Sequence, residues 1–481
     1  MSTDTASTDT ASRDNTEQLH YKEIYELSDL LSSGELSSQE VTRAMLERID
    51  AVDATIGSYA CLAADEAMAA ARRSDERRAA GRSLGRLDGV PLAVKDIYDK
   101  AGWPTEAGMA SRKGIVAATS ATVVERLEDA GAVILGKVHT TEGVYTEHTH
   151  PFRAPLNPWD AHRWVGVSSS GSGASTAAGL CFGALGSDTG GSIRMPSAAN
   201  GVTGLKPTWG RVSRAGVFEL AATLDHVGPM CRSARDAGLV LETIAGADDR
   251  DPTASLLPVP SLSVGEPRSM RGVRIGVDPQ WSYSAVSEDI EKTHRAAEAQ
   301  LSSLGAEIVE VALPDPTQAI EDWFGVCAAQ TARAHGEDFL KHRNTYGPAL
   351  RELIERGRQM SAIDYDELLL RRWNFKGRME AAVSTVDAVL IPALSFIAPP
   401  VEKMMRMDEE TTAGVHRFTV PFTLSQLPTI TFPGGFATTD SGRPFPVGLQ
   451  MVGPAFGEPA LVGIVDAFQR VTEWNKRHPD L

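Results

Sequence analysis

The chain has little of what marks several common classes of protein. It has only four cysteines in 481 residues, widely spaced and without a CxxC pair, namely Cys61, Cys181, Cys231 and Cys327. This argues against a disulfide scaffold or a cysteine-rich zinc site. No apolar run is long enough for a membrane helix, and the N-terminus lacks the basic start and apolar stretch of a signal peptide. From these absences we expect a cytoplasmic protein that does not associate with a membrane.

Clustered positive charge is also missing. The formal net charge is −16, and no Lys/Arg run is long enough to make a basic patch. Because an acidic surface repels phosphate backbones, nucleic-acid binding is not expected. Apolar residues make up 42% and charged residues 23% of the chain, which is ordinary for a globular protein with a large core.

The order of segments favours an α/β fold. Residues 1–18 repeat small polar residues, so we expect a disordered tail, followed by a single domain over residues 19–481. Ser37 and Glu40 form a capping-box pattern that predicts a helix start. Short apolar runs alternate with amphipathic segments, which is typical of a buried sheet covered by helices. The expected strands lie within 89–99, 130–137, 178–191, 272–279, 305–314, 387–394, 429–436 and 446–454, and residues 316–382 are expected to be a helical insertion.

A serine- and glycine-rich stretch at 166–194 needs a functional explanation. A flexible linker would not carry the apolar "AAGLCFGAL" in its middle. A phosphate-binding loop would need a P-loop lysine or a GxGxxG pattern, and the GxSxG elbow of many hydrolases is absent too. Within the stretch, "GSDTGGSIR" places consecutive small residues where backbone N–H groups can converge as an oxyanion hole, with Ser192 beside them.

A serine nucleophile needs a base. Histidines at 139, 148, 150 and 162 lie upstream, but "HTTEGVYTEHTH" lacks the HExxH spacing of a metal site, and polar loop residues explain it better. The other candidate is Lys95, which follows the apolar run "PLAV", where desolvation would favour a neutral amine. A lysine at a strand end is usually solvated, so spacing alone does not decide whether Lys95 is the base.

Three ordered motifs then resemble a known family. "GVPLAVKD", "SSSGSGASTAAGL" and "GSDTGGSIRMPSAANGVTGLKPT" are similar to the amidase signature family of serine hydrolases, and the resemblance extends to "LDHVGPMCRS" and the closing "LPTITFPGG…PVGLQMVGP". It implies an α/β/α sandwich around a large twisted mixed sheet, with a catalytic core at about 86–246. It also implies no metal or organic cofactor, and homodimerisation is common in the family.

The resemblance implies a role for individual residues. Lys95 corresponds to the general base, Ser168 to a bridging serine held by a cis peptide, and Ser192 to the nucleophile. The oxyanion hole corresponds to the backbone amides of Thr189, Gly190, Gly191 and Ser192. Ser169 corresponds to a supporting residue, and Asp188 and Arg194 to a pair that holds the loop.

The sequence departs from the family pattern on both sides of the paired serines. Glycines are expected there, and this chain has Val167 and Ser170 instead. A bulkier Val167 would narrow the site or change its geometry. Which of the three serines at 168–170 bridges the base and the nucleophile therefore depends on spacing, which favours Ser168.

The resemblance predicts an amidase but does not select its substrate. Aromatic residues in the variable segments, including Tyr145, Trp164, Trp323, Phe324 and Phe418, favour an aryl or hydrophobic amide over a very small one. Carbamates and esters are within reach of the same chemistry. The alternative is the glutamine-hydrolysing A subunit of a tRNA-dependent amidotransferase, which would need a partner protein. A third possibility, a scaffold without enzymatic activity, is disfavoured because Lys95, Ser168 and Ser192 are all present.

Overall fold

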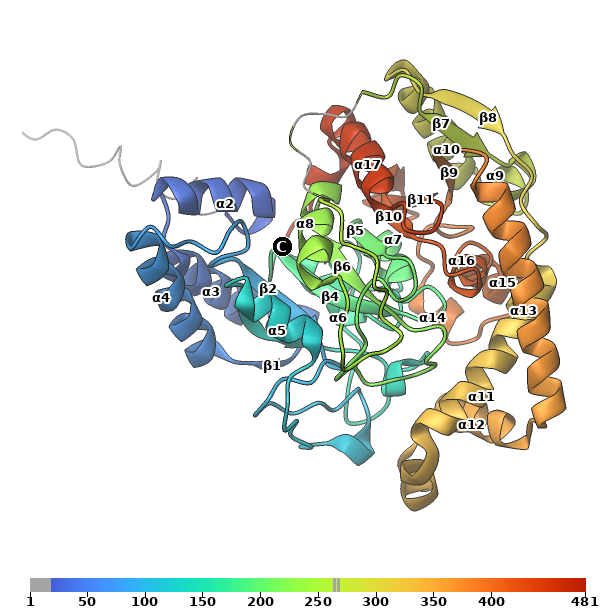
Figure 1. The fold of residues 1–481 in the computed structure, drawn as a ribbon, viewed down its shortest axis with the longest axis horizontal. Helices are drawn as coiled ribbons and strands as arrows, with labels where there is room; N and C mark the ends of the chain where they lie inside the picture. Colours follow the sequence, from blue (N-terminus) through green and yellow to red (C-terminus); the bar gives the residue numbers. More distant parts are fainter. Residues whose placement is uncertain (1–18, 263–264, 266–268) are drawn as a thin grey trace, which may run out of the picture.

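One large mixed sheet organises the chain. The structure, a computed structural model, describes residues 19–262, 265 and 269–481, so the tail predicted at 1–18 lies outside the described residues. Eleven strands lie in the order β1-β3-β2-β4-β6-β5-β10-β11-β9-β7-β8 (Figure 1). They are β1 Tyr59–Leu62, β2 Pro91–Lys95, β3 Val133–Val138, β4 Gly183–Asp188, β5 Thr203–Lys206, β6 His226–Cys231, β7 Arg274–Val277, β8 Glu307–Glu310, β9 Ala388–Pro392, β10 Thr429–Thr438 and β11 Pro444–Val452.

Helices cover this sheet, which confirms the predicted α/β fold. Helices α8 and α17 pack on each other, while α6 and α7 pack on each other and on strands at the middle of the sheet. The helices are α2 Ile24–Ser33, α3 Ser38–Ile56, α4 Ala64–Ala79, α5 Thr122–Asp129, α6 Ser170–Ala177, α7 Arg194–Asn200, α8 Ala234–Ile244, α9 Pro279–Tyr283, α10 Glu288–Ser303, α11 Thr317–His342, α12 Pro348–Gln359, α13 Ala362–Val383, α14 Val401–Met404, α15 Glu409–His416, α16 Val420–Leu424 and α17 Glu458–Thr472.

The pairing of strands explains their composition. Strand β2 is parallel to both β3 and β4, and every residue of these three strands is buried. Parallel strands need crossover connections and are covered on both faces, so they are continuously apolar rather than alternating. Antiparallel pairs such as β4 with β6 and β10 with β11 make the sheet mixed.

The predicted strands are all present, and the capping box at Ser37 is confirmed. The Ser37 side chain accepts from Glu40 N, and the Glu40 side chain accepts from Ser37 N at the start of α3. Three strands had not been predicted: β1, β5 and β6. Strand β6 contains Gly228 and Pro229, residue types that weaken a strand pattern, and β1 and β5 have only four residues each.

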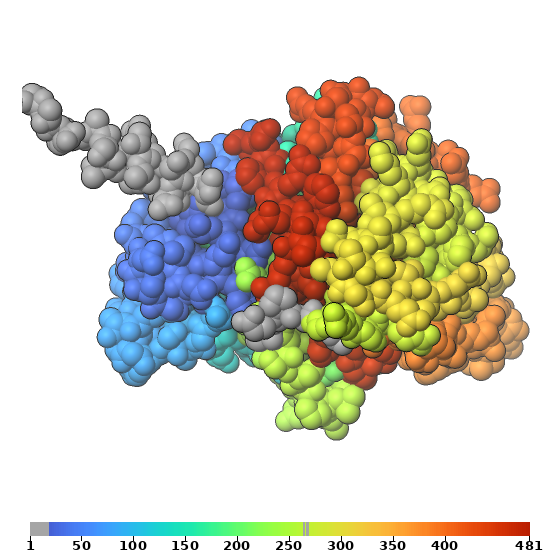
Figure 2. Space-filling view, turned by 90° about the horizontal axis from the view of Figure 1, so that it is seen from above, coloured from blue at the N-terminus to red at the C-terminus, as the bar shows by residue number. Residues whose placement is uncertain are grey.

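The segment from 316 to 382 forms the long helices α11, α12 and α13, which lie together on one side of the molecule in Figure 1 (orange). Figure 2 shows the C-terminal segment (red) between the N-terminal helices (blue) and the segment that contains α10 and β8 (yellow). Among the described residues, no helix is both long and apolar enough to cross a membrane.

Candidate active site

The sheet topology brings the predicted site residues to one edge. Strand β2 ends at Lys95 and the neighbouring parallel strand β4 ends at Asp188. The carboxyl ends of parallel neighbours lie at the same edge of a sheet, where α/β proteins commonly bind ligands. Helix α6 runs back from this edge before β4, so the serines at its start lie at the same edge, as does the loop that precedes α7.

Lys95 lies at the centre of this edge and is fully buried. Its Nζ is 2.7 Å from Ser168 Oγ, 3.0 Å from Ser169 Oγ and 2.9 Å from Ser187 Oγ. No carboxylate oxygen of the described residues forms a hydrogen bond or an ion pair with it. Burial lowers the pKa of Lys95 well below its usual value, and the more distant charges of Asp188 and Asp225 offset this only in part. The site therefore favours a neutral amine.

The hydroxyl groups around the amine have different partners. Ser169 Oγ donates to the Ser187 carbonyl at 3.2 Å and accepts from Ser187 N–H at 3.2 Å. The Ser169 hydroxyl proton is thus donated to the Ser187 carbonyl, so toward Lys95 this hydroxyl can act only as an acceptor. Ser168 Oγ has Lys95 as its single hydrogen-bond partner among the described residues. Ser187 Oγ likewise has Lys95 as its single partner there. A neutral amine carries one lone pair, and of the two hydroxyls with a free proton Ser168 lies nearer to it.

The residue before Ser168 belongs to an apolar cluster. The Val167–Ser168 peptide bond is cis. The half-buried Val167 side chain packs against a cluster that includes Trp164 and Met195. Met195 in turn lies close to the backbone of Gly191. An apolar cluster therefore begins directly beside Ser168, with Trp164 and Met195 buried in it and Val167 half-buried at its edge.

A buried ion pair supports the loop between β4 and α7. Arg194 donates from Nε and Nη2 to the two carboxylate oxygens of Asp188 at 2.9 and 2.8 Å, and neither side chain is exposed. Burial alone would raise the pKa of Asp188, but the Arg194 guanidinium, helped by Lys206 and His226, holds it below its usual range. This carboxylate stays charged and can anchor the loop.

The loop amides fall into two groups. Asp188 accepts from the N–H groups of Gly191 at 2.8 Å and Ile193 at 3.1 Å. Gly191, one of the four predicted oxyanion donors, therefore has its N–H turned to Asp188. Within the described part of the chain, the N–H groups of Thr189, Gly190 and Ser192 donate to no acceptor. The half-buried Ser192 hydroxyl also forms no hydrogen bond there.

A second carboxylate lies behind this loop, in the "LDHVGPMCRS" segment, and no role had been predicted for it from the sequence. Thr189 Oγ1 donates to Asp225 Oδ1 at 2.6 Å, and Asp225 also accepts from the N–H groups of Leu220 and Ala221. Burial raises the pKa of Asp225 to about 6, against the opposing effect of the Thr189 hydroxyl. Asp225 thus ties the loop between β4 and α7 to the segment before β6.

The sequence had also not connected Ser170 to a histidine. His148 Nε2 lies 3.0 Å from Ser170 Oγ. Burial, together with the charges of His139 and Lys95, lowers the pKa of His148 to about 3, so the imidazole is neutral. In the described ranges, no three His, Cys, Asp or Glu side chains gather as a metal site would require. The unusual serine at position 170 is therefore paired with a neutral histidine.

Three of the predicted pocket aromatics, Tyr145, Trp164 and Phe418, do not form one cluster. Trp164 lies in the apolar cluster that includes Val167. Tyr145 is half-buried and packs on the main core. Phe418 has no exposed surface and packs edge-on against Trp281, so it lies in the core with no face available to a ligand.

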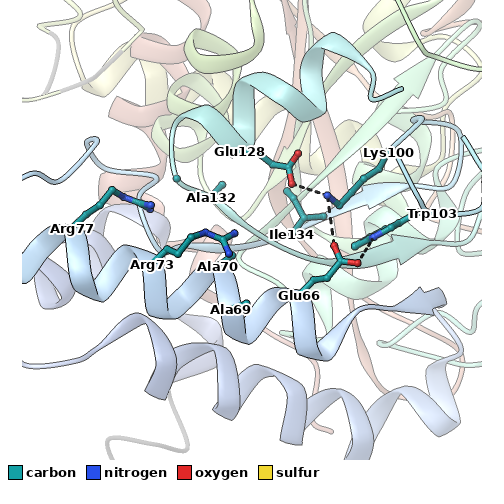
Figure 3. Close-up of a pocket in the computed structure, with 11 residues that line it drawn as sticks. Glu66, Ala69, Ala70, Arg73, Arg77, Lys100, Trp103, Glu128, Ala132 and Ile134 are labelled. Atoms are coloured by element: carbon teal, nitrogen blue, oxygen red, sulfur yellow. Dashed lines mark hydrogen bonds and ion pairs between the residues drawn. The ribbon is translucent and has the colours of Figure 1, made fainter. Parts of the chain in front are cut away.

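Two cavities lie away from the edge of the sheet that holds Lys95. Figure 3 shows one of about 260 Å³ beside α4, where Lys100 Nζ is 2.7 Å from Glu128 Oε1 and Trp103 Nε1 donates to Glu66 Oε1. Another, of about 720 Å³, lies between α9, α11 and α15. None of the predicted catalytic residues lines either hollow. The edge that holds Lys95 remains the candidate active site.

Comparisons with known proteins agree with this geometry. The sequence profile of the Amidase family matches residues 40–462. AmiD of Mycobacterium tuberculosis is 42% identical over 461 residues, which cover 95% of each chain. A glutamyl-tRNA(Gln) amidotransferase subunit of Chloroflexus aurantiacus is 35% identical over 96% of this chain and 99% of its own.

A solved structure extends the match to three dimensions. The native peptide amidase from Stenotrophomonas maltophilia superposes with a TM-score of 0.80 at 29% identity, covering 95% of this chain and 98% of its own. The family match, the relatives and the fold agree over nearly the whole chain. The protein thus belongs to the amidase signature family and is a hydrolase of carbon–nitrogen bonds other than peptide bonds.

Proposed function

We propose that this chain hydrolyses aryl or hydrophobic amides through a Ser192–Ser168–Lys95 triad and an acyl-enzyme. The observation that carries the proposal is the buried Lys95 amine, which is surrounded by hydroxyl groups and has no carboxylate partner among the described residues. A charged ammonium would be costly in that place, whereas a neutral amine can accept a proton. Ser168 and Ser187 each offer a hydroxyl whose only partner among the described residues is that amine, and the Ser168 oxygen is the nearer, at 2.7 Å against 2.9 Å.

In the proposed first half-reaction, Lys95 takes the proton of Ser168 while Ser168 takes that of Ser192. Ser192 Oγ then attacks the carbonyl carbon, and the oxygen of the tetrahedral intermediate accepts from the amides of Gly190 and Ser192, with Thr189 as a further donor. The relay returns the proton to the departing nitrogen as the C–N bond breaks. Each oxyanion donor is worth about 3–4 kcal/mol of barrier.

In the second half-reaction, water attacks the acyl-enzyme. The same relay takes one proton from the water and returns it to Ser192 Oγ as the ester bond breaks, which releases the acid. Gly191 supports the hole without donating, because its N–H is held by Asp188. Ser169 supports Lys95, because its own proton goes to the Ser187 carbonyl.

The apolar cluster beside Ser168 supports aryl or hydrophobic amides as the substrate class. Val167, Trp164 and Met195 lie in one cluster that also includes the half-buried Phe396 and Met404. Such a surface favours an aromatic or aliphatic acyl or amine group over a small polar one. A glutamine-hydrolysing enzyme would instead need polar groups to recognise an amide and an α-amino acid. Carbamates and esters with an aromatic group would be accepted by the same site.

A panel of substrates tests the proposal. The purified chain is incubated with p-nitroanilides, unsubstituted anilides, nitrophenyl carbamates, propionamide and glutamine, and amine or ammonia release is measured. We expect the fastest turnover with an aryl substrate and none with Ser192→Ala. The proposed substrate class would be overturned if glutamine were the one substrate of the panel that is hydrolysed. It would also be overturned if hydrolysis of glutamine appeared after a partner protein was added and no other substrate reacted. Equal rates for wild type and Ser192→Ala would overturn the mechanism.

A further inference from the structure

A tryptophan from the helical segment touches the oxyanion loop. Trp323, in α11, donates from Nε1 to the Thr189 carbonyl at 2.8 Å. Its indole lies over Gly190 so closely that a Cβ on Gly190 would come within 2.4 Å of Trp323 Cζ2. Only 5% of the Trp323 surface is exposed. The ring and the loop backbone therefore pack directly against each other.

This contact fixes one peptide group. In a trans peptide the carbonyl oxygen and the N–H of the next residue point in opposite directions. A hydrogen bond that holds the Thr189 carbonyl toward Trp323 consequently turns the Gly190 N–H to the other side of the loop. That N–H has no acceptor among the described residues, and it is one of the donors of the proposed oxyanion hole.

The other contacts of the loop fix neighbouring groups. Asp225 holds the Thr189 side chain, and Asp188 holds the amides of Gly191 and Ile193. In the described part of the chain, the Thr189 carbonyl accepts from Trp323 alone. A glycine such as Gly190 restrains its backbone less than any other residue, so this peptide depends on a contact from outside the loop.

Trp323 is itself held in place. Its ring contacts Phe324 edge-on, with centroids 4.9 Å apart, and lies 5.6 Å from the ring of His416. Phe324 and His416 also contact each other. The indole is therefore set by the packing of α11 against α15 rather than by the loop it touches.

We propose that Trp323 is a positioning residue, whose indole N–H orients the Thr189–Gly190 peptide so that the Gly190 N–H faces the developing oxyanion. The proposal rests on the proposed function. It adds a residue outside the family motifs to the apparatus for amide hydrolysis. Because the oxyanion forms only in the transition state, the effect belongs to kcat and not to substrate binding.

The test replaces Trp323 by Phe, which keeps an aromatic ring over Gly190 and removes the N–H. For the best aryl amide, kcat should fall about 10- to 100-fold with KM changed less than about twofold. The affinity for an aryl boronic acid, whose anionic oxygen occupies the oxyanion hole, should fall by the same factor. The affinity for the corresponding carboxylic acid product should stay unchanged.

The matched control is Trp103→Phe. Trp103 is also buried, and its Nε1 donates to Glu66 Oε1 at 2.9 Å, so an indole hydrogen bond is lost away from the loop. We expect this control to keep the wild-type kcat. Should Trp323→Phe fail to fold, benzothienylalanine at position 323 keeps the shape of indole without the N–H and should give the same loss of kcat.

Three outcomes would overturn the proposal. One is a kcat of Trp323→Phe within twofold of the Trp103→Phe value, and another is a change confined to KM. In both cases the proposed function would survive, because wild type would still turn over. If wild type releases no amine and Ser192→Ala binds the boronic acid as well as wild type does, both proposals fail together.

Discussion

Lys95 Nζ lies 2.7 Å from Ser168 Oγ, and neither side chain is exposed to solvent. An amine in water would be charged at neutral pH, and a charged amine cannot take a proton. Burial among hydroxyl groups removes that obstacle. The pair therefore fits the role of base that we propose for Lys95.

The first prediction concerns pH. The neutral amine is the active form and burial lowers the pKa of Lys95, so activity is present above that lowered pKa and is lost as pH falls through it. We expect kcat/KM for a neutral aryl amide to be retained at pH values where an ordinary lysine would be fully protonated. Lys95→Arg, which stays protonated, should be inactive throughout a pH profile from 5 to about 10. Substantial activity of that variant at any pH would contradict the role.

The second prediction separates the two neighbouring serines. Ser168→Ala removes the proton relay and should lower kcat for an anilide by about 10²–10⁴-fold, the usual contribution of general acid–base catalysis. Ser169→Ala removes a supporting hydrogen bond and should cost clearly less. Single-turnover rates of the two variants compare them directly. A larger loss of kcat for Ser169→Ala than for Ser168→Ala would contradict the proposed roles and make Ser169 the bridging serine.

The third prediction concerns the ion pair that anchors the loop. Arg194→Met leaves the Asp188 carboxylate buried without its partner, so the free energy of unfolding should fall by about 3–5 kcal/mol. Urea denaturation measures this. The control is Arg295→Met, which breaks an exposed pair with Glu291 on α10 and should leave the midpoint nearly unchanged. Equal midpoints for the two variants would show that the buried pair does not stabilise the fold.

The fourth prediction concerns space at the loop. Gly190→Ala would place a Cβ 2.4 Å from the Trp323 ring, so the loop or the ring must move. We expect kcat to fall at least tenfold. The matched control is Gly377→Ala, in the middle of α13, where a new Cβ would meet no heavy atom of the described residues within 4 Å. This control should retain full activity. A fully active Gly190→Ala would show that the loop tolerates displacement.

The fifth prediction concerns specificity. Val167 packs with Trp164 and Met195 next to Ser168. The substitution Val167→Gly removes the isopropyl group, so the substrate meets less apolar surface next to Ser168. The ratio of kcat/KM for an anilide over propionamide should then fall about tenfold, a typical effect of small changes in an apolar pocket. An unchanged ratio would place the substrate-binding surface elsewhere.

The fold was largely predictable from the sequence. Buried parallel strands such as β2 and β3 are apolar apart from one lysine each, Lys95 and Lys137, so short runs at 91–95 and 133–138 stood out. Strand β6 was missed because its pairing with β4 and β5 is decided by tertiary contacts, which outweigh its glycine and proline. Helix starts marked by a local pattern, as at Ser37, were predictable because the pattern is itself the cap.

The candidate site was predictable only where a motif marks it. Lys95, Ser168 and Ser192 lie in short family motifs, and Lys95 and Ser168 lie within hydrogen-bond distance of each other. Asp225 lies within the "LDHVGPMCRS" segment and Trp323 lies among the aromatics of the variable segments, but their contacts with the loop arise only through folding. The Ser169 hydroxyl is bonded to the backbone of Ser187, so its proton is not available to Lys95. The sequence could not predict these bonds, because they form only on folding.

The most direct test of the account is to locate the covalent intermediate. Wild type is quenched during turnover of a nitrophenyl ester of an aryl acid, and peptide mass mapping finds the acylated residue. We predict a single acyl group on the peptide that contains Ser192, absent in Ser192→Ala and formed much more slowly in Lys95→Ala. An acyl group on another residue, or an unchanged rate of acylation in Lys95→Ala, would contradict the account.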